Sequence, residues 1–179
     1  MLPSNITDAA YNDDHEAIQR WFAPNPDARD SHGKTLLLHA AITGSCKTMR
    51  VLLDNAATVD LANRDGRTPL HIAATNGHCA AAALLLDHGA KIEARSELGH
   101  TSLMSAAWEG HLDLVRFLLS KGADLDARLG LDDAESFARA DRRPKTAALL
   151  AEVRAAGGWK AFVRAPRIRL LALRYFCEE

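Results

Sequence analysis

The sequence predicts an all-α fold, a solenoid of about five helix-turn-helix repeats with hairpin loops, followed by a C-terminal helix. The main observation is self-similarity at a period of 33 residues. DGRTPLHIAA at 65–74 returns as LGHTSLMSAA at 98–107, and DSHGKTLLLHAA at 30–41 keeps the same register. LLLDHGAKIE at 84–93 and FLLSKGADLD at 117–126 also recur in register. Three consecutive clear repeats follow from this agreement: 30–62, 63–95 and 96–128.

Residues 1–29 are predicted to form a degenerate first repeat. Ala9 and Ala10 stand where the later repeats have alanine pairs, and a helix follows with Ile18, Trp21 and Phe22 on its inner side. A terminal repeat has one face toward water, so departure from the pattern is expected there.

The start and stop signals of the helices are clearest in the second clear repeat. Thr68 is a favourable N-cap, and Pro69 fits the first helical position, where its missing N–H costs nothing. Gly77 stops this helix, and Gly89 supplies the left-handed turn that closes the next one. Helices this short are unstable alone in water, so each pair must pack on its neighbours.

Residues 129–158 are predicted to form a degenerate last repeat that ends the domain 1–158. DDAESFARADRRPKTAALLAEV keeps the two-helix rhythm, although residues 142–144 replace the Gly-His pair of the earlier repeats and the alignment slips by a residue or two.

The intact TPLHIA at 68–73, together with the 33-residue period, resembles the ankyrin repeat. The resemblance implies an ankyrin-type solenoid in which alanine pairs keep helix faces close and leucines fill the seams. It also implies structural roles for three histidines, whose side chains would hydrogen-bond to backbone and hold adjacent loops. These are His71, His78 and His111.

The first clear repeat should be the least stable of the three. Leu36 replaces the motif proline, and Ala56 stands where Gly89 and Gly122 close the second helix in the other repeats. We therefore expect a positive φ at Ala56, which strains a residue with a side chain.

The basic tail, residues 159–179, is the main compositional shift. Residues 153–179 contain six basic residues and two glutamates, which gives a net charge of +4. The rest of the chain has a net charge of −5. A helix from Pro166 would be apolar on most sides. It could cap the last repeat, dock a partner protein, or contact an anionic membrane or nucleic acid. The tail resembles those of predicted ankyrin proteins of unicellular algae.

Composition favours a soluble single domain. The chain of 179 residues is 47% hydrophobic with a net charge of −1, so no general affinity for nucleic acid is expected. The absence of a basic segment with an apolar run at the start predicts a cytoplasmic location, with nuclear or organellar ones open. Three cysteines suit a reducing compartment, and we expect Cys46 and Cys79 to be reduced and buried.

Gly33-Lys34-Thr35 resembles the end of a phosphate-binding loop, but the first glycine of that loop would fall at Ala28. The triplet also recurs as Gly66-Arg67-Thr68, so the lysine is a variable turn residue. No nucleotide binding is expected.

The sequence offers no motif for catalysis, a metal or a cofactor. No H-E-x-x-H, C-x-x-C or G-x-S-x-G occurs. His39 and Cys46 lack further ligands at usable spacing. Asp60, Glu93 and Asp126 recur at the period and should form a stacked ladder along the loops, which is not a converging acid and base.

The resemblance places partner-binding residues at the hairpin tips and at the exposed end of each first helix, which line the concave face. Trp108 stands out, because Thr75 and Ile42 occupy the equivalent positions and tryptophan is common in binding hot spots. The candidate residues are Lys34, Ile42, Arg64, Asp65, Arg67, Thr75, Asn76, Leu98, His100, Trp108 and Glu109.

These observations predict a non-catalytic interaction module or scaffold that binds a protein or peptide on its concave face. One alternative is an anchor or assembly subunit whose basic tail docks on a larger complex or anionic membrane, membrane contact being expected only through that tail. Another alternative is an enzyme of unrecognised type.

Overall fold

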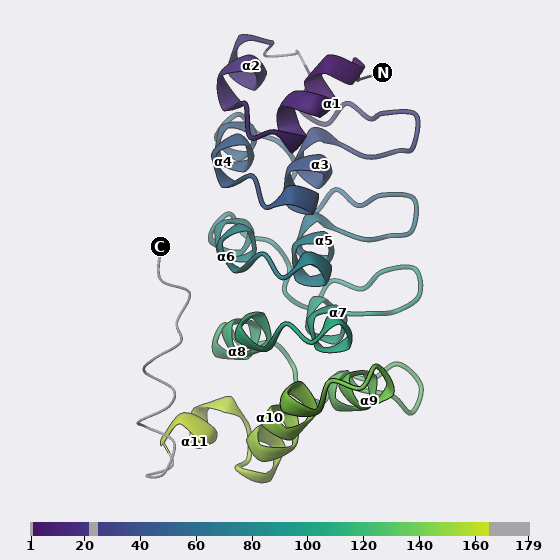
Figure 1. Ribbon diagram of the computed structural model, residues 1–179, viewed down its shortest axis with the longest axis vertical. Coiled ribbons are helices and arrows are strands. Elements are labelled where there is room, and N and C mark those ends of the chain that lie inside the picture. Colours follow the sequence, from purple (N-terminus) through teal and green to yellow (C-terminus); the bar gives the residue numbers. More distant parts are fainter. Residues whose placement is uncertain (1, 22–24, 165–179) are drawn as a thin grey trace.

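The computed structural model describes residues 2–21 and 25–164, and within these ranges it has eleven helices and no strand. Ten helices form five successive pairs that stack into an elongated solenoid, with hairpin loops projecting on one side (Figure 1). The predicted all-α solenoid is confirmed. The helices are α1 (Ser4–Tyr11), α2 (His15–Arg20), α3 (Leu36–Thr43), α4 (Cys46–Asp54), α5 (Pro69–Asn76), α6 (Cys79–Asp87), α7 (Ser102–Glu109), α8 (Leu112–Ser120), α9 (Ala134–Ala140), α10 (Pro144–Ala155) and α11 (Trp159–Arg164).

Local signals place the helix ends where the sequence predicts them. The Thr35 hydroxyl accepts a hydrogen bond from the Leu38 N–H at 3.3 Å, so it is the N-cap of α3. Glycines end α3, α5 and α7 in the left-handed conformation, with φ of 72°, 74° and 82°.

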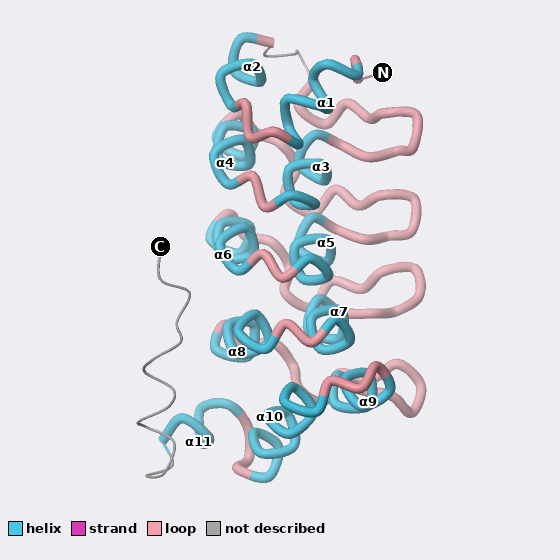
Figure 2. Tube along the Cα trace, in the orientation of Figure 1, coloured by secondary structure: helices cyan, strands magenta, loops and turns pink. Residues whose placement is uncertain are grey.

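Two rows of helices enclose the core. The first helices of the pairs (α1, α3, α5, α7, α9) form one row beside the hairpins, and α2, α4, α6 and α8 form the other (Figure 2). Ala73 and Ala74 of α5 have no exposed surface, and Leu70 and Leu85 are equally buried between the rows. Small residues allow close helix approach while the leucines fill the space between the rows.

Side chains at the start of the second helices bond to the preceding repeat. His78 and His111 lie against Gly44 and Gly77, where an added Cβ would come within 2.8 Å and 2.6 Å of the imidazole rings. The glycines are therefore needed for room as well as for their positive φ. The structural roles expected of these histidines are confirmed. The bonds join His78 Nε2 to Ile42 O (3.0 Å), His111 Nε2 to Thr75 O (2.9 Å) and, in the last repeat, Arg143 Nε to Trp108 O (3.4 Å).

The acidic residues that recur at the repeat period form a carboxylate ladder along the loops. Asp27, Asp60 and Glu93 each accept a hydrogen bond from a backbone N–H that lies 31 residues further along the chain, whereas Asp126 accepts from the Arg154 side chain. Their role is thus to hold consecutive loops together. The bonds run from Thr58 N to Asp27 Oδ1 (2.8 Å), from Lys91 N to Asp60 Oδ1 (3.2 Å) and from Asp124 N to Glu93 Oε1 (2.8 Å).

Two expectations about single residues have opposite outcomes. Ala56 has a φ of 65°, so the predicted left-handed turn is present without glycine. No disulfide joins Cys46 to Cys79, but both side chains are half-buried, so the expectation that they are buried is wrong. Each is the first residue of its helix, at the edge of the helix row, and Leu112 at the same place in α8 is also half-buried.

The ends of the solenoid are closed by less regular repeats. Ile18 of α2 is 1% exposed, and Trp21 packs half-buried against the core. At the other end α11 lies on α10 and α8 and buries Phe162. The rest of the basic tail from residue 165, like Phe22, lies outside the described residues. In the described part of the chain, no helix combines the length and apolarity needed to cross a membrane.

Candidate functional site

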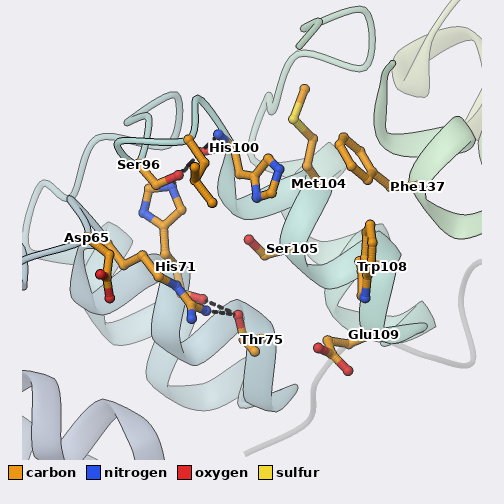
Figure 3. A pocket seen from close by; sticks show the side chains of 12 residues that line it. Asp65, His71, Thr75, Ser96, His100, Met104, Ser105, Trp108, Glu109 and Phe137 are labelled. Carbon is orange, nitrogen blue, oxygen red and sulfur yellow. Dashed lines mark hydrogen bonds between the residues drawn. The ribbon is translucent and has the colours of Figure 1, made fainter. Parts of the chain in front are cut away.

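A cavity of about 230 Å³ opens beside the second and third clear repeats and the start of the last one (Figure 3). Its walls come from α5, α7 and α9 and from the two hairpins that precede α5 and α7. The lining residues are Asp65, Arg67, His71, Thr75, Ser96, Leu98, His100, Met104, Ser105, Trp108, Glu109 and Phe137.

One wall of this pocket is aromatic and apolar. Phe137 of α9 contacts both Trp108 and His100, with ring centroids 5.5 Å and 5.1 Å away (Figure 3). Phe137 is 9% exposed, whereas Trp108 is 42% and Leu98 72% exposed. The tryptophan thus rests on a buried ring and presents much of its own surface to solvent.

The facing wall is polar and is fixed by hydrogen bonds. His71 is fully buried, with Nδ1 2.8 Å from the Thr68 hydroxyl oxygen and Nε2 2.8 Å from the His100 carbonyl oxygen. Since a carbonyl only accepts, Nε2 donates. Nδ1 accepts, because the Thr68 backbone N–H donates to it at 3.3 Å, and the ring is therefore neutral. The Arg67 guanidinium donates to the Thr75 hydroxyl, and Thr75 in turn donates to the His71 carbonyl oxygen at 3.0 Å.

Burial keeps both pocket histidines neutral. Desolvation lowers the pKa of His71 and of His100, and the Arg67 charge lowers both further. The hydrogen bond with the His100 carbonyl opposes this for His71 without reversing it. At neutral pH the full positive charge of the pocket lining therefore belongs to Arg67.

The structure brings seven of the eleven predicted partner-binding residues together around this cavity. The other four lie elsewhere. Arg64 donates to the Ser31 carbonyl at the hairpin tips, Asn76 donates to Ile72, and Ile42 packs half-buried in a small apolar cluster with Leu38. Lys34 is half-buried one repeat before Arg67. The seven are Asp65, Arg67, Thr75, Leu98, His100, Trp108 and Glu109.

Sequence reasoning missed the inner lining of the pocket. Phe137 is the main omission, and it occupies the repeat position of His71 and Met104. That position was assigned a structural role from the motif histidine, and the degenerate last repeat obscured its register. Counting 33 residues on from Met104 is the signal that finds Phe137. Ser96 and Ser105 were missed as well.

A second polar group lies in the first clear repeat. His39 is 5% exposed, and its Nε2 lies 2.9 Å from Asp30 Oδ2. Burial lowers the pKa of His39. Burial would raise the pKa of Asp30, but hydrogen bonds from Lys34 N–H, His39 and His32 N–H lower it overall. Ser31 and Asp30 both approach the same nitrogen of His32, Nδ1, so these groups do not form a nucleophile relay.

Among residues 2–21 and 25–164, no three His, Cys, Asp or Glu side chains converge in a way that could hold a metal ion. The pocket joins aromatic surface to one guanidinium and to rim carboxylates, which suits non-covalent recognition.

Comparison with known protein families gives two matches. A model of three ankyrin repeats matches residues 6–96, and a model of a single ankyrin repeat matches residues 98–128. No curated relative matches the chain. The family matches cover more than half of the sequence and agree with the stacked helix pairs and hairpins, so this chain belongs to the ankyrin repeat family.

Proposed function

We propose that this protein is a non-catalytic interaction module that binds a protein or peptide partner on the face formed by its hairpins and first helices. Ankyrin repeats are generally protein–protein interaction modules, and the family is typically non-catalytic. The proposal for this chain adds the location: the pocket around Trp108.

The observation that carries the proposal is the exposure of Trp108. Thr75 and Ile42 fill the same position in the preceding repeats, so the fold does not require an aromatic residue there. Trp108 is 42% exposed and lines a cavity. Tryptophan buries a large area at small entropic cost, which is why it is enriched among residues that dominate binding energies.

A crosslinking pull-down from native extract, analysed by mass spectrometry, tests this proposal. Three baits are compared: the full chain, Trp108→Ala and Leu131→Ala. Leu131 is a suitable control because it is 90% exposed and does not line the pocket. The proposal expects a partner that the full chain and Leu131→Ala capture and Trp108→Ala loses. Equal capture by all three baits would show that the pocket around Trp108 does not bind the partner.

A further inference from the structure

We propose that the pocket recognises an extended peptide segment that inserts one large apolar side chain against Trp108 and places a carboxylate against Arg67. This inference rests on the proposed function and adds the chemistry of the partner.

The apolar part of the inference follows from the size and walls of the pocket. About 230 Å³ is less than the space that encloses a drug-sized ligand, so it suits a single side chain. Leu98, Met104 and Trp108 offer apolar surface, with Phe137 behind them. Burial of apolar area against these residues would supply most of the affinity.

The carboxylate follows from the state of Arg67. Its guanidinium is half-buried and donates to the Thr75 hydroxyl, and no carboxylate of the described residues forms an ion pair with it. Five N–H donors are available on a guanidinium, so one hydroxyl leaves most of them for a ligand. A carboxylate matches this planar donor set better than a neutral group does.

The repeat places further nitrogen-bearing side chains at the position of Arg67 along the face formed by the hairpins and first helices. Lys34, Arg67 and His100 occupy equivalent positions in consecutive repeats, each just before the N-cap threonine. Packed helices are about 8–10 Å apart, a span that about three extended residues cover. We therefore place a second carboxylate of the segment three residues from the first, opposite Lys34, which has no ion pair among the described residues.

Glu109 decides the direction of the segment. Glu109 follows Trp108 and lines the same cavity without an ion pair in the described part of the chain. Its charge repels acidic groups from the Trp108 side. The acidic end of the segment should therefore run toward α3 and the apolar anchor toward α9.

A displayed library of random peptides, selected on the full chain, tests the inference. Enriched peptides should combine an aromatic or large aliphatic residue with Asp or Glu nearby. A synthetic peptide of the enriched sequence should bind Arg67→Met about tenfold more weakly, since a charge-assisted bond is lost. Arg67→Lys should recover part of that loss, Glu109→Gln should bind slightly better, and Leu131→Ala should be unchanged. Melting curves check that each variant is folded.

Four results would overturn the inference. Three of them are enrichment of Lys- or Arg-rich peptides, peptide affinity that is unchanged in a folded Arg67→Met variant, and failure to enrich any peptide. Peptides that need Trp108 but carry no acidic residue would end the inference and leave the proposed function intact. Equal capture by the three pull-down baits would count against the proposed function itself.

Discussion

The first and third clear repeats have the same backbone fold, and each departs from the common sequence pattern. The departure lies at a buried position in the first repeat and at an exposed position in the third. The departure in the first repeat is buried: Leu38 takes the place of His71, and the neighbouring His39 bonds to Asp30 of its own hairpin. His71 instead bonds forward to the His100 carbonyl of the next repeat. The first repeat has thus replaced a link between repeats by a link within one.

The departure in the third repeat is exposed. Trp108 stands at the end of α7, at the position that Ile42 and Thr75 fill in the preceding repeats. Since burial differs, the two departures should have separable consequences. The buried one should change stability, and the exposed one should change recognition.

The largest expected effect is that of His71→Leu. The variant leaves the Thr68 hydroxyl and the His100 carbonyl without their partner, so the free energy of unfolding should fall by about 3 kcal/mol. His39→Leu is the matched control. Its partner Asp30 keeps bonds from two backbone N–H groups, so the loss should be about 1 kcal/mol. Urea denaturation measures both, and equal losses would refute the contrast between the repeats.

Trp108→Ala should produce the next largest effect, on binding. Partner affinity should fall by about 2 kcal/mol or more, while the free energy of unfolding changes by under about 1 kcal/mol. Calorimetric titration with the captured partner and urea denaturation give the two numbers. A large loss of stability beside unchanged binding would show that the ring serves packing on Phe137.

Ala56→Gly should stabilise the protein by about 1 kcal/mol, because glycine adopts a positive φ without strain. Gly89→Ala is the reverse substitution at the equivalent turn of the next repeat. Its φ is 84° and an added Cβ would meet nothing within 4 Å, so a similar loss would be purely conformational. Melting temperatures that shift in the same direction for both variants would contradict this account.

The smallest expected effect is a dependence of stability on pH. Burial lowers the pKa of His71 and His39, so below neutral pH the unfolded chain binds more protons than the folded one. Stability is then fully present above the usual histidine pKa of about 6.5 and declines as the pH falls below it. The melting temperature should drop between pH 7.5 and 5.5, and less so in His71→Leu. A rise on acidification would show that these rings are protonated in the folded state.

The sequence predicted those features that depend on local conformation. Thr68, Gly77 and Ala56 each sit at a repeat position with one backbone requirement, so counting in register was enough to place the N-cap, the helix stop and the positive φ. Seven of the candidate partner-binding residues line one cavity for the same reason, since exposed positions recur with the repeat.

The features that depend on the neighbouring repeat could not be predicted in this way. Burial of Cys46 was expected from its register, but exposure depends on how far the next helix covers the first turn. Phe137 belongs to α9, and its contact with Trp108 joins two repeats of different regularity. That contact follows from the packing of α9 on α7, which the repeat pattern alone does not contain.

The carboxylate ladder allows a whole repeat to be removed or added while the hydrogen bonds between loops are kept. Each acidic side chain meets a backbone N–H at one fixed separation, so removal of residues 63–95 would bring Asp60 to the N–H of Asp124 in place of Lys91. His111 would likewise reach the Ile42 carbonyl that His78 now uses. A chain that lacked or gained one such unit would keep its loop bonds, while the cavity beside Trp108 would have one wall exchanged. Duplication or loss of a repeat is therefore a change of the cavity lining that leaves the scaffold in register.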